Sequence, residues 1–193
     1  MAAKGKRRKD NRRARILDAA ALCFSRAGYE GTSVRDISTA AGILPGSMYY
    51  HFASKEEVLG AVHDEGLRKV KSRVTKAIAR QSDPWARLEA ACIAHLKALH
   101  AAKEYGSVIA TEFPRRHSKK LRTRMIVERE AYENIFRELI DVLPLRPGIS
   151  RKYLRLSLIG AMAWTLVWYS PGGDGVDEIA KQIVNLFRAA RSD

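Results

Sequence analysis

The stretch from Thr32 to Leu59 constrains the fold of this chain more than any other. It reads TSVRDISTAAGILPGSMYYHFASKEEVL, in which two short helical patterns are joined by a glycine turn and followed by a third. Ser33, with Asp36 three residues later, predicts a helix start, and Gly42 predicts the end of that helix. Pro45 suits the first turn of the next helix, where its missing N–H has no cost. This order predicts a helix-turn-helix unit, whose second helix can enter a DNA major groove.

The second helical pattern combines a docking face with a polar face. Met48 and Phe52 lie four residues apart and predict the side that packs inward. The remaining positions can hydrogen-bond, namely Ser47, Tyr49, Tyr50, His51 and Lys55. The alternative is an ordinary amphipathic hairpin that contacts no DNA. Ser54 and Glu57 then form a capping box that predicts the start of another helix.

The charge distribution favours a polyanionic partner. The 193 residues carry a formal net charge of +14, and 46% of them are hydrophobic, which is ample for a packed core in one large or two small domains. Residues 1–55 hold 11 Lys and Arg against 4 Asp and Glu, which is half of the net charge in less than a third of the chain. The positive charge is therefore densest around the predicted helix-turn-helix unit.

Several other classes of protein are disfavoured. Cys23 and Cys92 lie in apolar helical runs and are expected to be buried, reduced thiols rather than a redox switch. The five histidines form no HExxH or other compact ligand set, and no Gly-rich phosphate loop or nucleophile elbow occurs. We therefore expect no enzyme, no metal site and no cofactor. His95 is expected to be a satisfied core histidine rather than a ligand.

The ends and apolar runs of the chain indicate its compartment. The basic N-terminus is not followed by an apolar segment, so it does not resemble a secretory signal. The apolar run near residues 156–169 is too short to span a bilayer. These features predict a cytoplasmic protein with no membrane partner.

We expect an all-α fold of about nine helices in three regions. Residues 1–9 are predicted to be a basic disordered arm, which either neutralises DNA phosphates or serves as a solubilising tail. Residues 10–54 form the predicted DNA-binding domain, whose first helix starts at Asp10 or Asn11 and ends before Gly28. Residues 55–193 form the predicted ligand-binding and dimerisation domain. Its helices are expected over 55–79, from Asp83-Pro84 onward, over 107–113 between Gly106 and Pro114, over 119–142 and 150–169, and after an Asp174 cap.

Two C-terminal segments suggest binding surfaces. The run from Arg115 to Arg124 contains six Lys or Arg residues, and is either a solvated loop with a helix start or a surface for an anionic effector. From Leu156 to Tyr169 the chain is apolar nearly all round, which predicts a helix buried on every side. One of its faces is expected to pack on a second subunit, together with the last helix. The predicted dimer contacts are Leu158, Ala161, Met162, Thr165, Ile183 and Phe187.

The strings TSVRDIS, AGI and GSMYYHFASKEE closely resemble the N-terminal domain of TetR-family transcriptional regulators. The resemblance covers about residues 10–60 strongly and implies an all-helical homodimer bound to double-stranded operator DNA, with a C-terminal domain for a small-molecule effector. It implies a phosphate-binding role for Lys55 at the next helix start. The predicted DNA-binding residues are Arg12, Arg13, Thr32, Ser33, Arg35, Pro45, Gly46, Ser47, Tyr49, Tyr50, His51 and Lys55.

The strings ILPGSMYYHFASKEE and GAMAWTLVWYSPGG are similar to the TetR subgroup that controls fatty-acid and steroid degradation. That resemblance implies a repressor released by an acyl-CoA thioester, whose phosphates would suit the basic 115–124 segment. The candidate ligand-binding residues are Leu96, Ile109, Phe113, Arg116, Tyr132, Phe136, Trp164 and Trp168. The alternative for the two tryptophans is plain core, which an aromatic pair four residues apart on a helix more often indicates. A hydrophobic effector without CoA is the alternative ligand, and a sequence-indifferent DNA-coating protein is the alternative class.

Overall fold

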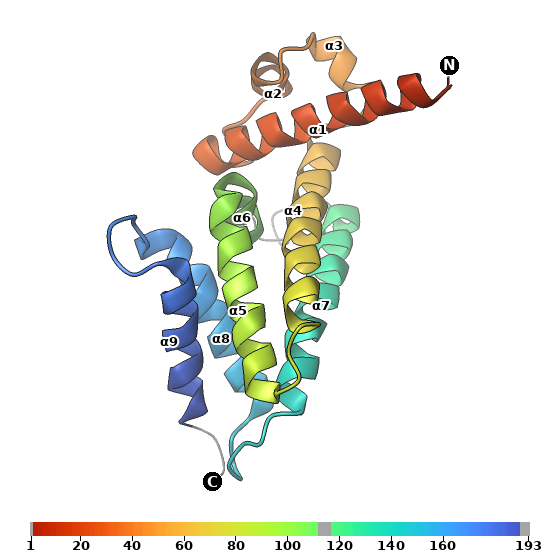
Figure 1. Ribbon diagram of the computed structural model, residues 1–193. Helices are drawn as coiled ribbons and strands as arrows, with labels where there is room; N and C mark the ends of the chain where they lie inside the picture. Colours follow the sequence, from red (N-terminus) through yellow and green to blue (C-terminus); the bar gives the residue numbers. More distant parts are fainter. Residues whose placement is uncertain (1, 112–116, 190–193) are drawn as a thin grey trace. The chain divides into compact units, whose positions relative to one another are not determined.

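The computed structural model describes residues 2–111 and 117–189, with side chains from Asn11 onward, and this part of the chain forms nine helices (Figure 1). They are α1 (Ala2–Ala27), α2 (Val34–Ala40), α3 (Pro45–Met48), α4 (Lys55–Ile78), α5 (Pro84–Ala101), α6 (Lys103–Thr111), α7 (Lys119–Asp141), α8 (Arg151–Trp168) and α9 (Val176–Arg188). The predicted all-α fold is confirmed. None of the described helices is both long enough and apolar enough to cross a membrane.

The chain divides into two compact units whose boundaries cut through helices. The first unit comprises Met1–Gly66 and Glu104–Val127, and the second comprises Leu67–Lys103 and Glu128–Asp193. Both α4 and α7 therefore contribute residues to each unit. The sequence predicted a boundary at Lys55 instead, at the start of α4.

The first unit is built on the α1 helix, with α2 and α3 on one side of it (Figure 1). α1 packs against α2, and α2 packs against α3; apolar residues at helical spacing on these helices and on the first half of α4 are buried. The buried side chains are Ile16, Leu17, Ala20, Phe24, Ile37, Met48, Phe52, Val58, Leu59 and Val62. Burying this many apolar groups is what stabilises helices as short as α2 and α3, since neither would persist alone in water.

Two glycines let other helices of the first unit approach α4 closely. A Cβ at Gly60 would lie 2.8 Å from Leu121 Cδ1 on α7, and a Cβ at Gly66 would lie 2.7 Å from Ile109 Cδ1 on α6. Any side chain at either position would therefore displace its neighbour. The first unit thus holds α6 and the start of α7 in direct contact with α4.

Polar contacts fasten the same elements. They are Tyr105 Oη donating to Asp18 Oδ1 at 2.7 Å, Ser118 N donating to Glu56 Oε1 at 2.7 Å, and Arg124 Nε donating to Asp64 Oδ2 at 2.8 Å. The hydrogen bonds from Ser118 lower the pKa of the Glu56 carboxyl. Burial, together with the bond to Asp18, raises the pKa of Tyr105. These contacts join α6 to α1, and α7 to α4.

Three predicted element boundaries differ from the structure. α1 begins at Ala2 rather than Asp10, so residues 2–9 continue the helix instead of forming a disordered arm; Ala, Lys and Arg are all good helix formers. α6 runs through the buried Gly106, which was expected to precede it, and the predicted end at Phe113 lies outside the described residues. The N-cap of α9 is Gly175, one residue after the predicted Asp174.

In the second unit α5 packs against both α8 and α9, and α8 packs against α9 (Figure 1). The largest buried side chains include Leu88, Leu96, Phe136, Leu158 and Met162. Two ion pairs join α5 to α9 at the surface, Lys97 to Asp177 at 2.6 Å and Arg188 to Glu89 at 2.9 Å. Exposed pairs of this kind stabilise only slightly, so apolar burial holds the unit together.

An aromatic cluster at the centre of the second unit contains His95. Its Nδ1 lies 2.6 Å from Tyr132 Oη, and its ring stands edge-on to Phe136 at 5.9 Å between centroids. The prediction of a satisfied core histidine is thereby confirmed. Burial lowers the pKa of His95 to about 4, and the nearby His100 adds to the effect.

This buried imidazole predicts a specific loss of stability in mild acid. Below pH ~6.5 the unfolded chain binds a proton that folded His95 refuses until about pH 4, so the free energy of unfolding falls as the pH falls through that window. Between pH 7.5 and 5.0 we expect His95 to contribute a loss of roughly 2 kcal/mol. His95→Gln keeps a hydrogen-bonding group but does not titrate, so urea unfolding should show a shallower pH dependence for the variant. An identical pH dependence in both proteins would contradict a neutral buried His95.

Candidate nucleic-acid interface

The start of α2 is fixed by a reciprocal pair of hydrogen bonds. The Asp36 amide donates to Ser33 Oγ at 3.1 Å, and the Ser33 amide donates to Asp36 Oδ2 at 2.8 Å. These bonds from Ser33 lower the pKa of the Asp36 carboxyl. The predicted capping box is confirmed and is complete. Ser33 and Arg35 are both exposed at this end of α2, which leaves them free to meet a DNA backbone.

The turn between α2 and α3 depends on Gly42 and on a side chain from α1. Gly42 has a φ of +64°, a conformation that side chains other than glycine rarely adopt. Arg15 Nη2 donates to the Ala41 carbonyl at 2.8 Å and would lie 3.1 Å from a Cβ at Gly42. Arg15 therefore fixes the end of α2 against α1. Its role was missed from the sequence, because the partner is a backbone carbonyl distant in the chain.

The predicted reading side chains lie on the one-turn α3 helix and in the turn that follows it. Met48 is fully buried and Phe52 is 2% exposed, as the sequence predicted, whereas Tyr50 is 87% exposed. α3 ends at Met48, so Tyr49 and Tyr50 lie in the turn that follows instead of within a helix. Leu44, just before Pro45, is 76% exposed and was not predicted as part of this surface. The reading surface is thus one turn of helix with its two flanks.

A cleft of about 380 Å³ lies beside α3 within the first unit. It brings together four predicted DNA-binding residues with parts of α1 and of the turn. The lining residues are Arg12, Arg15, Ile16, Gly42, Ile43, Leu44, Ser47, Tyr50 and His51. Two guanidinium groups beside hydroxyl and imidazole groups can contact phosphate oxygens and base edges together. Of the other predicted contacts, Pro45, Gly46 and Tyr49 are exposed, and Arg13 lies 5.2 Å from the centroid of the Phe52 ring.

Thr32 and Lys55, both predicted to contact DNA, are hydrogen-bonded within the chain. Thr32 is 3% exposed, and its hydroxyl donates to the Gly28 carbonyl at 2.8 Å. Lys55 Nζ donates to the carbonyls of Tyr29 and Thr32, each at 2.8 Å, and lies 4.1 Å from the Tyr29 ring centroid. An ammonium group has three donors, so two are already used to hold the loop between α1 and α2.

The capping box predicted for α4 is present, but one of its two hydrogen bonds has a different partner. The Glu57 amide donates to Ser54 Oγ at 3.1 Å, as the capping box requires. The Glu57 carboxylate, however, accepts from the Ala53 amide at 2.6 Å and not from Ser54 itself. The carboxylate of Glu57 therefore binds the amide one residue before the one that the capping box predicts.

The candidate ligand-binding residues do not form one group. Leu96, Tyr132 and Phe136 are buried in the second unit, where Tyr132 and Phe136 meet with ring centroids 5.7 Å apart. Ile109 belongs to the first unit, and Phe113 and Arg116 lie outside the described residues. Trp164 and Trp168 are 60% and 51% exposed, so within this chain they do not line an interior cavity.

The predicted dimer contacts are partly corrected by the burial of α8. Leu158, Met162 and Thr165 are fully buried within the second unit, so no partner can reach them, whereas Ala161, Ile183 and Phe187 are half-buried. The exposed α8–α9 stripe consists instead of Tyr153, Leu156, Gly160, Trp164, Val167, Trp168 and Leu186. An apolar helix face of this size on the surface marks a site of interaction.

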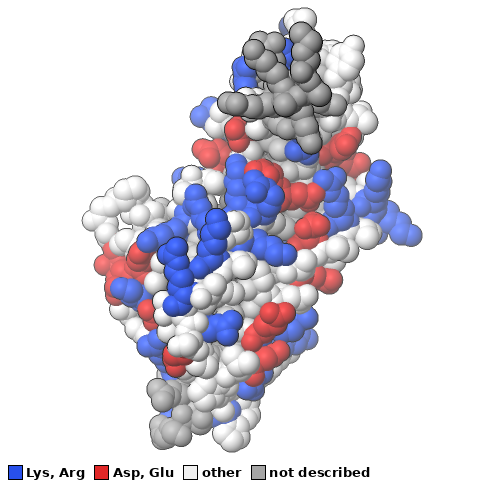
Figure 2. All heavy atoms as spheres, turned by 45° about the vertical axis from the view of Figure 1, so that its right-hand side comes forward, with Lys and Arg blue, Asp and Glu red and all other residues white. Residues whose placement is uncertain are grey.

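Positive charge is spread well beyond the reading surface. Figure 2 shows Lys and Arg side chains over much of the visible face, with Asp and Glu among them.

Within the part of the chain that is described, no three His, Cys, Asp or Glu side chains are placed to hold a metal ion.

A docked short helix with exposed polar side chains, preceded by a capped helix and a glycine turn, defines a helix-turn-helix DNA-binding protein. Residues 16–62 match the family of bacterial regulatory proteins of the tetR type, and residues 81–190 match a tetracyclin repressor-like C-terminal domain. The chain belongs to the TetR family.

Similar proteins cover nearly the whole chain. The HTH-type transcriptional repressor KstR2 of Rhodococcus jostii is 31% identical, over 92% of this chain and 90% of its own. The structure of the ketosteroid regulator KstR2 of Mycobacterium tuberculosis has a TM-score of 0.79 at 24% identity, over 94% of this chain and 95% of that one. AibR in complex with isovaleryl coenzyme A and operator DNA also has a TM-score of 0.79, at 23% identity, over 91% and 97%.

The hydrogen bonds of Lys55 within the chain predict that its replacement lowers the stability of the fold more than it lowers the affinity for DNA phosphates. Lys55→Met keeps the aliphatic stem and deletes both hydrogen bonds to the α1–α2 loop, so we expect a loss of about 2 kcal/mol in the free energy of unfolding. Urea unfolding measures this loss. Arg35→Met, at an exposed site, should leave stability nearly unchanged. If instead Lys55→Met is as stable as wild type and reduces the salt dependence of DNA binding, Lys55 is a phosphate ligand.

The exposure of Tyr50 predicts a role in sequence reading. Tyr50→Ala should weaken binding to a specific operator by about tenfold and leave binding to random duplex DNA unchanged, because base contacts carry the sequence information. Arg35→Met should weaken both kinds of binding and reduce the salt slope by about one. Fluorescence anisotropy over a range of salt concentrations measures both quantities. Equal losses on both DNAs for Tyr50→Ala would indicate a sequence-indifferent binder.

Proposed function

We propose that the protein is a cytoplasmic homodimeric repressor that binds operator DNA and is released from it by an acyl-CoA thioester. The observation that carries the proposal is the reading surface of α3, in which Met48 and Phe52 dock the helix while Tyr49 and Tyr50 face outward. We expect no catalytic activity, because the polar groups of this surface suit recognition rather than turnover.

Dimerisation follows from the exposed α8–α9 stripe. Three of its side chains are largely exposed: Trp164 at 60%, Val167 at 66% and Leu186 at 77%. Exposing apolar surface to water is unfavourable in free energy, and contact with the same face of a second copy would remove that surface from water. Gly160 has no atom within 4 Å of where its Cβ would lie, so a partner helix could approach there. A two-fold dimer would place two reading surfaces on successive major grooves, with half-sites about 34–36 Å apart.

An acyl-CoA effector is supported by the relatives and by charge. KstR2 is named as a repressor and as a ketosteroid regulator, and AibR has the same fold with isovaleryl coenzyme A and operator DNA bound. The excess of Lys and Arg in this chain, 35 against 21 Asp and Glu, suits a ligand with several phosphates. A hydrophobic effector that lacks CoA is the alternative.

The effect of the ligand on DNA binding would pass through helices shared by the two units. α4 carries residues of both units, and its first half is fastened to α6 and α7 through the Gly60 and Gly66 contacts. A ligand that binds one arrangement of α4 more tightly shifts the population towards it. Release requires only that this arrangement separate the two reading surfaces by the wrong distance.

Purified protein, its promoter DNA and a panel of acyl-CoA thioesters test the proposal. Native mass spectrometry should show a dimer, and one thioester should raise the Tm and lower operator affinity by tenfold or more in an anisotropy assay. Release by a CoA-free hydrophobic molecule would replace the thioester as the effector and keep the repressor. Operator affinity that no ligand changes would overturn the ligand-responsive mechanism.

A further inference from the structure

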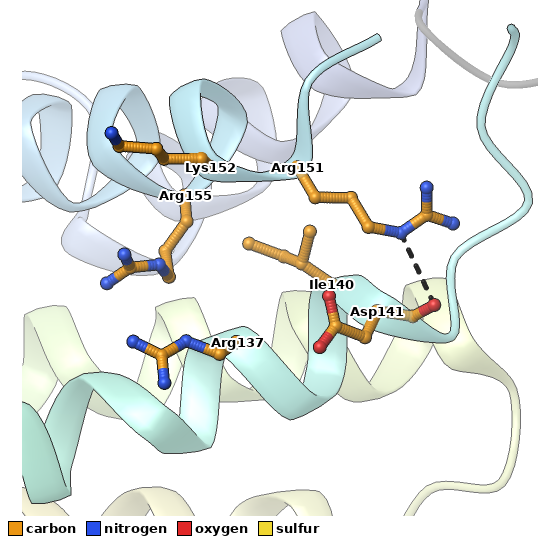
Figure 3. Close-up of a pocket in the computed structure, with 6 residues that line it drawn as sticks. All are labelled: Arg137, Ile140, Asp141, Arg151, Lys152 and Arg155. Carbon is orange, nitrogen blue, oxygen red and sulfur yellow. Dashed lines mark hydrogen bonds between the residues drawn. The ribbon is translucent and has the colours of Figure 1, made fainter.

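A pocket of about 420 Å³ lies in the second unit, where α7 ends and α8 begins (Figure 3). Its wall is dominated by cations, with one carboxylate and one apolar side chain. The lining residues are Arg137, Ile140, Asp141, Arg151, Lys152 and Arg155. This pocket uses none of the residues of the reading surface or of the exposed α8–α9 stripe.

Arg155 and Arg151 have polar partners within the chain, and Lys152 Nζ lies 5.7 Å from the centroid of the Tyr153 ring. Arg155 forms an ion pair with Glu133. Arg151 donates to the backbone carbonyls of Asp141 at 3.4 Å and Leu143 at 3.0 Å. In the described part of the chain, Arg137 and Lys152 form no hydrogen bond or ion pair, and both side chains are exposed.

The backbone adds further positive potential at the same place. α8 is an 18-residue helix whose N-cap, Ser150, makes no side-chain hydrogen bond to it, and its first turn holds no acidic residue. The first N–H groups of such a helix remain without intrahelical partners, and this end of the helix favours negative charge. Arg151 and Lys152 occupy the first two positions instead, where cations are unfavourable. An anion bound in the pocket would relieve this repulsion.

From the four cations that line this pocket at an uncapped helix start, we propose that the pocket binds the phosphate groups of a nucleotide. Guanidinium groups bind phosphate oxygens through paired hydrogen bonds, and Figure 3 shows those of Arg137 and Arg155 reaching the same gap from α7 and α8. The Asp141 carboxylate can accept a hydrogen bond from a ribose hydroxyl, which a simple inorganic anion would not offer.

Calorimetric titration with adenosine 3′,5′-bisphosphate, and with adenosine as its uncharged counterpart, tests the site. The bisphosphate should bind and adenosine should not. Arg137→Gln and Lys152→Gln should each weaken the bisphosphate by about tenfold, since each loses a hydrogen bond to a charged group. Both side chains are exposed, so neither variant should have a Tm below that of the wild type.

Matched controls separate a built site from general attraction. Arg73→Gln and Lys76→Gln remove the same charges from exposed positions of α4 outside the pocket, and should change the affinity by less than twofold. Equal losses in pocket and control variants would reduce the effect to net charge and overturn the proposal. Undetectable binding of the bisphosphate at about millimolar concentration would also overturn it.

The nucleotide could be part of the effector thioester or a separate metabolite, and DNA release distinguishes the two. If Lys152→Gln weakens release by an acyl-CoA but not by the corresponding acyl-pantetheine, the pocket holds the nucleotide end of the effector. If Lys152→Gln loses the bisphosphate but responds to the acyl-CoA as wild type does, the pocket serves a separate nucleotide. Should no thioester release the operator, the proposed effector fails, while the titration with the bisphosphate still decides the site.

Discussion

The two compact units depend on one continuous helix, α4, whose first half belongs to the first unit and whose second half belongs to the second. The helix holds no proline, which is a common cause of a sharp kink. A Cβ at Gly60 would lie 2.8 Å from Leu121 Cδ1 and a Cβ at Gly66 would lie 2.7 Å from Ile109 Cδ1, so a larger residue at either position would make these side chains move. A displacement of α4 would therefore press on α6 and on the start of α7, and α6 is hydrogen-bonded to α1 by Tyr105.

The reading surface depends on burial more than on helix propensity. A four-residue helix such as α3 has no stability of its own, because so few backbone hydrogen bonds cannot offset the entropy of nucleation. It exists because Met48 and Phe52 enter the core, and because Arg15 and Lys55 hold the preceding turns by their carbonyls. Packing thus orients Tyr50 towards solvent, where it is available to DNA.

Features set by neighbouring residues could be predicted from the sequence, and features set by tertiary contacts could not. The Ser33 capping box and the inward face of α3 follow from spacings of three and four residues, and the structure contains both. The two carbonyls that Lys55 binds lie 26 and 23 residues away, a pairing that no local pattern shows. The sequence also could not predict which face of α8 is exposed. A helix that is apolar on every side gives no periodicity to choose Trp164 over Leu158.

The clustering of positive charge in the pocket between α7 and α8 also could not be predicted from the sequence. Arg137 and Lys152 lie on different helices, and each reads in the sequence as an ordinary exposed cation. Both line one pocket because the end of α7 lies near the start of α8, and the ion pair of Arg155 and Glu133 joins the two helices. Bringing like charges together costs free energy, and a ligand that neutralises them returns it on binding. Because a ligand that binds only the folded chain stabilises that chain, occupancy of this pocket and stability of the second unit are linked.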